Sequence, residues 1–68
     1  MKTEYDKEVD AAYIYLADKI EKGAVQKTIK LNDNISLDFD KDNKLLGIEI
    51  LKASETLPKI KDFTKLAA

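Results

Sequence analysis

Residues 35–51 read ISLDFDKDNKLLGIEIL, two apolar runs on either side of an acidic turn. Apolar and polar residues alternate before the turn, and Leu46, Ile48 and Ile50 continue the alternation after it. A period of two is typical of β-strands, so the stretch predicts a β-hairpin. Its acids at positions 38, 40, 42 and 49 also have the ligand spacing of an EF-hand calcium loop, which is the competing interpretation.

The apolar register decides between the two interpretations. An EF-hand loop needs a helix on each side and favours glycine at its sixth place, where this chain has Asn43. A hairpin with residues 41–44 as its loop instead matches three apolar pairs at once. These pairs are Phe39 with Leu46, Leu37 with Ile48, and Ile35 with Ile50. We therefore predict a hairpin in which Asn43 takes a positive φ.

The rest of the chain predicts a small sheet with one helix. Residues 2–16 alternate around the polar turn DKEVD and predict an N-terminal hairpin. VQKTIKL adds a strand before the central hairpin, so residues 25–51 form a three-stranded meander. In residues 57–66 apolar side chains recur every three positions around Pro58, which predicts an amphipathic helix. We expect a single small domain over residues 1–68 with an α+β fold, a mainly antiparallel β-meander sheet of about five strands with the C-terminal helix on its apolar face.

The composition excludes several classes of function. The 68 residues include no Cys and no His, which removes thiol nucleophiles, zinc–thiolate sites and imidazole bases. The net charge of −1 provides no basic field, and no apolar run approaches the roughly 18 residues of a membrane span. We expect a cytoplasmic protein without nucleic-acid or membrane partners. A domain this small, with no disulfide, also favours a homo-oligomer, with another protein as a further partner.

The predicted register gathers polar residues on the outer side of the sheet. The candidate polar cluster consists of Asp38, Glu49, Gly47, Ser36, Thr28 and Lys30. Asp38 and Glu49 become diagonal neighbours at about 7–8 Å, with an open spot at Gly47 between them. Paired carboxylates can do acid–base chemistry or hold Mg²⁺ or Ca²⁺, which makes these two acids weak metal-ligand candidates. The other interpretation is an ordinary solvated face with no cofactor.

Four large side chains share this outer side and form a candidate interface. They are Tyr13, Tyr15, Leu45 and Leu51. Both tyrosines alternate with Ile14, which points to the opposite side. Such a group can meet a second chain, pack within its own chain or stack a ligand, and the sequence leaves the three alternatives open.

The chain resembles the domain-of-unknown-function family 2283, the YuzE-like small prokaryotic proteins. The resemblance covers roughly residues 4–54 and rests on YDKEVDAAYIYL and ISLDFDKDNKLLGIEILKAS. The matching residues are Tyr5, Asp6, Asp10, Tyr13, Ile14, Asp38, Asp40, Gly47, Ile48, Glu49, Ala53 and Ser54. The chain departs from the family pattern at Asn43, where glycine is usual, and at Ala12, where a larger apolar residue is usual. The resemblance implies a compact, sheet-rich fold with a C-terminal helix, and no established activity.

Two functions from different classes remain in view. The first is a non-enzymatic homodimer that binds another protein or regulates it, of which an antitoxin-like role is one form. The alternative is a metal-assisted hydrolase or small-ligand binder that uses Asp38 and Glu49, with a divalent cation as its only cofactor. The scarcity of catalytic residue types favours the first.

Overall fold

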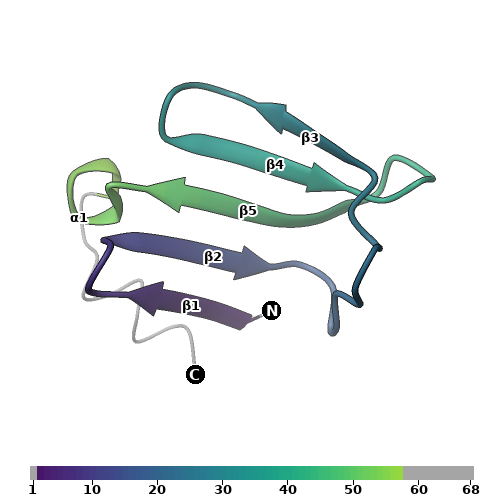
Figure 1. The fold of residues 1–68 in the computed structure, drawn as a ribbon, viewed down its shortest axis with the longest axis horizontal. Helices are drawn as coiled ribbons and strands as arrows, with labels where there is room; N and C mark the ends of the chain where they lie inside the picture. The colour runs from purple at the N-terminus through teal and green to yellow at the C-terminus, as the bar shows by residue number, and fades with distance from the viewer. Residues whose placement is uncertain (1, 58–68) are drawn as a thin grey trace.

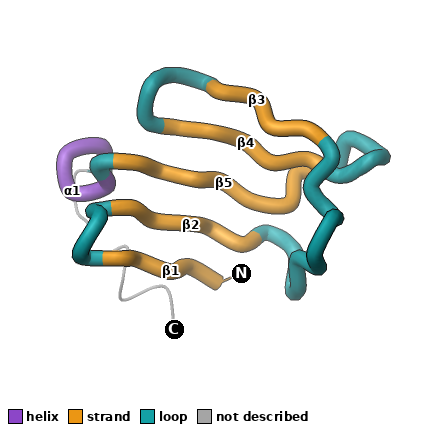
Figure 2. The backbone as a smooth tube through the Cα atoms, viewed as in Figure 1, coloured by secondary structure: helices purple, strands orange, loops and turns teal. Residues whose placement is uncertain are grey.

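The computed structural model describes residues 2–57, which form one antiparallel sheet of five strands and one short helix (Figures 1 and 2). The elements are β1 (Lys2–Asp6), β2 (Ala11–Tyr15), β3 (Lys27–Lys30), β4 (Ile35–Phe39), β5 (Leu45–Leu51) and α1 (Ala53–Thr56). The predicted α+β class, with a five-stranded antiparallel sheet and a helix C-terminal to it, is confirmed. The helix predicted over residues 57–66 lies, apart from Leu57, outside the described residues.

The strand order is β1-β2-β5-β4-β3, so β5 runs through the middle of the sheet (Figure 1). β3, β4 and β5 follow one another as a meander, whereas residues 16–26 carry the chain from β2 to the far edge. β2 then pairs with β5, Ala12 opposite Ile50 and Ile14 opposite Ile48. Matching apolar sides explain this register, because a slip of one residue would turn these side chains to the other side of the sheet.

The β4–β5 hairpin follows the predicted register except at its turn. Ile35 pairs with Ile50 and Leu37 with Ile48, as predicted. The predicted pair of Phe39 with Leu46 is wrong, because Phe39 lies opposite Leu45 and the register shifts between positions 38 and 39. The shift is a β-bulge, in which two residues of one strand oppose one residue of the other.

Asp40 explains why the turn is shorter than predicted. Its backbone N–H donates to the carbonyl of Lys44 at 3.0 Å, which closes a loop of residues 41–43. Its Oδ1 accepts hydrogen bonds from the N–H groups of Asp42 (2.8 Å) and Lys44 (2.9 Å). Asn43 has the predicted positive φ, 63°. Strands flank this loop and Asp40 binds its backbone, so the hairpin interpretation is confirmed over the EF-hand.

Helix α1 begins at Ala53 because a residue from the β1–β2 turn caps it. Asp10, with a φ of 53°, accepts the Ala53 N–H on its backbone carbonyl at 2.8 Å. Its carboxylate accepts the N–H and hydroxyl of Ser54 at 3.0 and 2.6 Å, and the Tyr5 hydroxyl at 2.7 Å. The helix ends at Leu57, whose backbone is extended. This cap satisfies N–H groups that the first turn of a helix leaves without a partner.

The small hydrophobic core lies where α1 meets the sheet. Ala12, Ile50 and Ala53 are its buried residues. Four partly buried side chains pack around them: Tyr5, Ile14, Ile48 and Leu57. The core therefore covers the β1, β2 and β5 part of the apolar side, and it leaves the other side of the sheet to polar residues.

Candidate functional site

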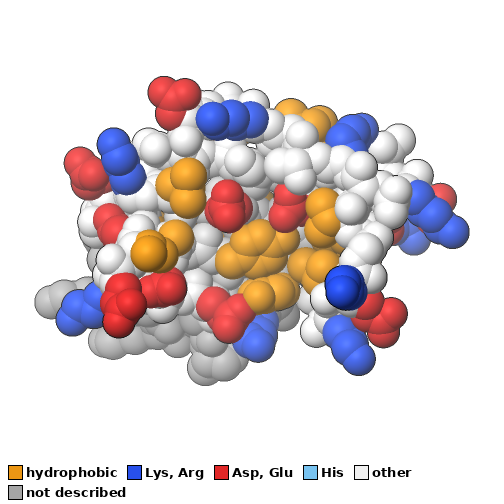
Figure 3. All heavy atoms as spheres, in the orientation of Figure 1, with side chains coloured by type: hydrophobic (Ala, Val, Ile, Leu, Met, Phe, Trp, Pro, Cys, Tyr) orange, Lys and Arg blue, Asp and Glu red, His pale blue; other side chains and the backbone are white. Residues whose placement is uncertain are grey.

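The predicted cluster and both tyrosines of β2 lie on the polar side of the sheet, the side seen in Figure 3. Tyr13 of β2 pairs with Glu49 of β5. Gly47 of β5 lies between Tyr15 of β2 and Asp38 of β4, and it pairs with both. Figure 3 shows hydrophobic side chains in the middle of this side, acidic groups next to them and most basic groups near the rim. Three neighbouring strands thus bring an aromatic and acidic group together.

A hydrogen-bonded bridge crosses four strands on the polar side of the sheet. The Tyr13 hydroxyl, from β2, donates to Oδ2 of Asp38, on β4, at 2.8 Å. Thr28, on β3, donates its hydroxyl to the other oxygen of Asp38 at 2.7 Å. Both oxygens of the Asp38 carboxylate therefore accept a hydrogen bond from the protein, and the bridge ties four adjacent strands together, since it passes over β5.

The Tyr13 side chain crosses β5 at Gly47 to reach Asp38. A Cβ added there would lie 2.5 Å from Cζ and 2.6 Å from Cε2 of Tyr13, well inside ordinary van der Waals contact. The predicted open spot beside Gly47 is therefore wrong, because the Tyr13 ring fills it. Glycine is required here for the close approach of an aromatic ring to the backbone.

The environment of Tyr13 keeps its hydroxyl protonated. Burial raises the pKa of Tyr13 well above its usual value, and the hydrogen bond to Asp38 raises it further. The negative charges of Asp38 and Glu49, and the nearby Tyr15 hydroxyl, act in the same direction. A tyrosine with a raised pKa is a hydrogen-bond donor at neutral pH and a poor general base. The arrangement supports a structural role for Tyr13.

Tyr15 has its own partners on the same side. Its hydroxyl donates to Glu4, its ring packs edge-to-face on Tyr13 with centroids 4.8 Å apart, and the Lys2 ammonium lies 5.4 Å from its ring centroid. The hydrogen bond to Glu4 raises the pKa of Tyr15, with smaller contributions from burial and the Glu4 charge. Both tyrosines thus pack within their own chain, which was one of the three predicted alternatives.

The remaining predicted residues are placed by the sheet without joining the bridge. Asp38 and Glu49 are diagonal neighbours across β4 and β5, and Lys30 lies opposite Ser36 across β3 and β4. Leu45 is half-buried and Leu51 is 40% exposed. Within residues 2–57, no three or more Asp and Glu side chains are arranged to hold a metal ion. The metal-ligand roles of Asp38 and Glu49 have no support from this geometry.

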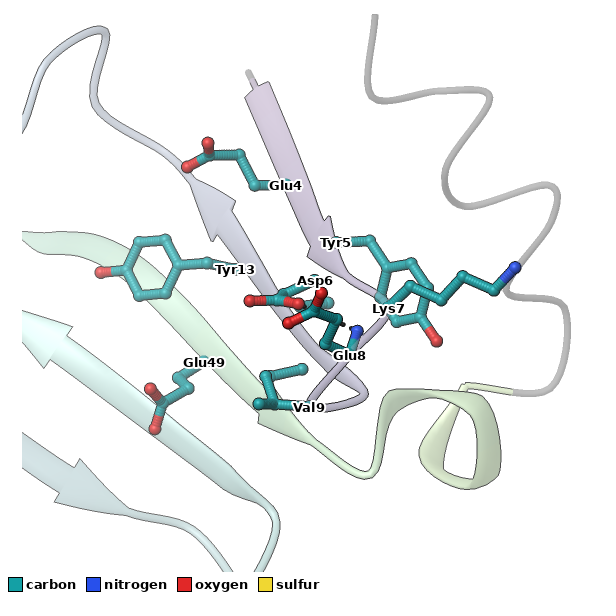
Figure 4. Close-up of a pocket in the computed structure, with 10 residues that line it drawn as sticks. Glu4, Tyr5, Asp6, Lys7, Glu8, Val9, Tyr13 and Glu49 are labelled. Carbon is teal, nitrogen blue, oxygen red and sulfur yellow. Dashed lines mark hydrogen bonds between the residues drawn. The ribbon is translucent and has the colours of Figure 1, made fainter.

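A shallow groove of about 680 Å³ lies over β1, β2 and the turn that joins them, and Glu49 of β5 also lines it (Figure 4). Acidic side chains line it: Glu4, Asp6, Glu8 and Glu49. Asp6 also accepts the Glu8 N–H at 3.0 Å, which stabilises the turn. The sequence analysis did not predict this acidic group, because only Glu49 belongs to the predicted polar cluster. The strand order β1-β2-β5 brings Glu4, Asp6 and Glu8 near Glu49.

These observations define a class of protein, a small antiparallel sheet domain whose polar side is held together by tyrosine–carboxylate hydrogen bonds. The family model described as protein of unknown function (DUF2283) matches residues 2–54, and the chain belongs to this family. The match does not extend to the YuzE-like label, which stays a prediction. No curated protein and no solved structure matches the chain. Within residues 2–57, no helix has the length and apolar composition needed to cross a membrane.

The residues that carry the family resemblance have structural roles here. Asp10 and Ser54 fasten α1 to the β1–β2 turn, and Asp40 shapes the β4–β5 turn. Asp38 and Gly47 hold the Tyr13 bridge. These five residues of the resemblance therefore make contacts that hold the described part of the chain together.

Proposed function

We propose that the protein is a non-enzymatic protein-interaction module that acts as a homodimer. The observation that carries the proposal is the incompletely covered apolar side of the sheet. Within residues 2–57 the buried hydrophobic residues are Ala12, Ile50 and Ala53, and no large side chain is fully buried. An apolar sheet face needs a second layer, and the four residues of α1 are too short to supply it alone.

Among residues 2–57, the part of the apolar side that lacks a covering layer lies over β4 and β3. Ile35, Leu37 and Phe39 are half-buried, and Ile29 is 44% exposed. A second copy that packs the same patch across a two-fold axis would supply the missing layer, as in a β-sandwich. Full burial of such a side chain contributes about 1.5–3 kcal/mol, so covering the patch stabilises both subunits.

The polar side is less suited to self-association. An isologous contact there would bring Asp38 and Glu49 towards the same carboxylates of the second copy, and like charges facing each other are unfavourable. Tyr13 and Tyr15 already have partners in their own chain. For this reason the proposal places the dimer contact on the apolar side, and the interface predicted at Tyr13, Tyr15, Leu45 and Leu51 stays a prediction.

The metal-assisted hydrolase or ligand binder based on Asp38 and Glu49 is not favoured. A cation at Asp38 would compete with the hydroxyl groups of Tyr13 and Thr28, each of which donates a hydrogen bond to one of its carboxylate oxygens. We expect the melting temperature to stay unchanged in millimolar Mg²⁺, Mn²⁺ or Ca²⁺. A cation present at a hundred times its dissociation constant would add about 2.7 kcal/mol to the free energy of unfolding. The melting temperature would then rise measurably.

A regulatory role in the cytoplasm belongs to the same proposal, and an antitoxin-like role is one form of it. The absence of cysteine is compatible with a reducing compartment, where no disulfide would be available to stabilise so small a domain. The interaction module would act through binding, with no chemical step of its own.

The molar mass in solution tests the dimer. We expect light scattering on the full chain to give twice the monomer mass of 7.7 kDa, and Leu37→Lys to give the monomer mass with its circular dichroism retained. Val9→Lys is the matched control, because Val9 lies in the β1–β2 turn, is 67% exposed and should leave the dimer intact. If Leu37→Lys does not fold, Leu37→Ala should still weaken dimerisation.

A monomer at every concentration would refute the proposal. If a monomeric full chain became a dimer after truncation at Leu57, the chain's own residues 58–68 would be the cover of the apolar side.

A further inference from the structure

In the part of the chain that the structure describes, residues 2–57, no strand pairs with the outer edge of β3. β3 is the last strand in the order, and all four of its residues are exposed. Hydrophobic side chains on and beside it are exposed as well: Val25 by 36%, Ile29 by 44% and Leu31 by 63%. An edge strand presents unpaired N–H and C=O groups, the groups that an added strand binds.

The pairing with β4 determines which backbone groups are free. In an antiparallel pair, residues that exchange hydrogen bonds alternate with residues whose N–H and C=O point away. The Leu31 N–H donates to the Ile35 carbonyl at 2.8 Å, so Leu31 and Ile29 direct their backbone groups at β4. The N–H and C=O groups of Thr28 and Lys30 therefore point out of the sheet.

The charge of this edge is basic. Residues 24–31, AVQKTIKL, contain two lysines and no acid. The Lys27 ammonium is turned to its own sheet, where it donates to Asn43 Oδ1 at 2.9 Å and lies 5.4 Å from the Phe39 ring centroid. Lys30 is exposed, and it has no ion pair with any residue between positions 2 and 57. Lys30 is thus the charge available to a strand arriving at this edge.

The strand already paired on the other side of β3 indicates what fits. β4 reads ISLDF, in which apolar residues on one side alternate with Ser36 and Asp38 on the other. Ile29 lies opposite Leu37, and the Thr28 hydroxyl donates to Asp38. A strand on the free edge would meet the same side chains of β3, so it should carry apolar residues towards Ile29 and carboxylates towards Thr28 and Lys30.

We propose that the β3 edge binds an extended segment of another protein in which acidic and apolar residues alternate. Such a segment adds a sixth strand through the backbone groups of Thr28 and Lys30, and its carboxylates pair with Lys30. A second copy of β3 fits the edge less well, because it brings two more lysines and no acid. The inference deepens the proposed role as an interaction module by naming its partner class. The added strand lies beside β3 and leaves the apolar side over β4 to the dimer, with Ile29 next to both contacts.

A synthetic peptide with the sequence of residues 33–40, DNISLDFD, is the probe, because it has the required alternation. In a nuclear magnetic resonance titration of the full chain, we expect shifts and slowed hydrogen exchange at the amides of Thr28 and Lys30. Replacing the three aspartates of the peptide by lysine should weaken binding by about tenfold or more, since like charges would then face Lys30.

Variants of Lys30 separate the backbone contribution from the charge. Lys30→Pro should abolish binding and keep the fold, because its N–H makes no hydrogen bond within the sheet. Lys30→Glu should fold like the wild type and lose affinity for the acidic peptide, which keeps the test decisive if the proline variant does not fold. Lys41→Ala, in the exposed β4–β5 turn, is the matched charge control and should bind normally.

Three results would overturn the inference. They are an absence of change at Thr28 and Lys30 in millimolar peptide, equal binding of the lysine-substituted peptide, and slowed exchange at Ile29 and Leu31 instead of the outward amides. The molar mass, measured by light scattering on the same samples, reports the dimer separately. If the chain is a dimer and does not bind the peptide, only the proposed edge binding is refuted. If the chain is a monomer and binds the peptide, only the proposed dimer is refuted.

Discussion

Replacing Gly47 with alanine should show how strongly the polar side depends on the Tyr13 ring. The added Cβ would lie 2.5 and 2.6 Å from Cζ and Cε2 of Tyr13, so the ring must move away. The hydroxyl then leaves its position 2.8 Å from Asp38 Oδ2. Overpacking costs about 1–3 kcal/mol, and losing a partly exposed hydrogen bond adds about 1 kcal/mol. The gain from replacing glycine in a strand offsets about 0.5–1 kcal/mol. We expect a net loss of about 1–3 kcal/mol in the free energy of unfolding.

The same substitution should be harmless when the ring is absent. In a Tyr13→Ala background nothing remains for the new Cβ to meet, so Gly47→Ala should be neutral or stabilising by about 0.5–1 kcal/mol. The double-mutant cycle then gives a coupling of about 1–4 kcal/mol between the two positions. Tyr15→Ala is the matched control background, because Tyr15 lies directly opposite Gly47 and its ring is not among the nearest atoms.

Urea unfolding followed by circular dichroism gives the free energies, and thermal melts provide a second readout. In a domain of this size a loss of 1 kcal/mol lowers the melting temperature by roughly 4–8 °C. The reasoning is refuted if Gly47→Ala costs the same in the wild-type, Tyr13→Ala and Tyr15→Ala backgrounds. The glycine would then be required for the backbone of β5 and not for the ring above it.

Four further substitutions test other contacts. Asp38→Asn should lower the free energy of unfolding by about 1 kcal/mol, because an amide offers one acceptor oxygen to two donors, while Glu49→Gln should leave urea unfolding unchanged. The hydrogen bonds from Ser54 lower the pKa of Asp10, so its contribution is complete above about pH 4 and is lost as the pH falls through the lowered value. Asp10→Asn should therefore lower the melting temperature near neutral pH and differ least from wild type in acid; a constant difference would contradict this. Asn43→Gly should change stability by less than about 0.5 kcal/mol, since glycine adopts the φ of 63° without strain, and a large loss would show that its side chain matters more than its backbone.

The strands and most of their pairing could be predicted because they follow from local pattern. Alternation in residues 35–51 indicated two strands, and matching their apolar sides was enough to pair Ile35 with Ile50. The turn was the exception. Asp40 draws in two backbone N–H groups and shortens the loop, and the bulge then restores the register. The alternation of apolar and polar residues in the two strands does not predict that the Asp40 side chain binds the backbone of the loop.

The candidate site shows the same division. Cross-strand spacing was sufficient to group Asp38, Glu49 and Gly47 on one side of the sheet. It was insufficient to show that Tyr13 lies over the glycine and satisfies Asp38, because that contact depends on β2 lying next to β5. The Tyr13 ring fills the predicted gap between the two acids, and Asp38 accepts hydrogen bonds from Tyr13 and Thr28.

The sequence by itself determined where the strands lie, which side of each is apolar, and that one turn favours a left-handed residue at Asn43. These properties are local, since the side-chain period and the backbone preference of a residue depend on its immediate neighbours. The tertiary structure decided that β2 joins β5, that Tyr13 reaches Asp38 across 25 positions, and that Asp10 caps α1 across 44. Contacts over such separations depend on strand order, which is set by burying all the apolar sides together, and no single stretch of the chain encodes it.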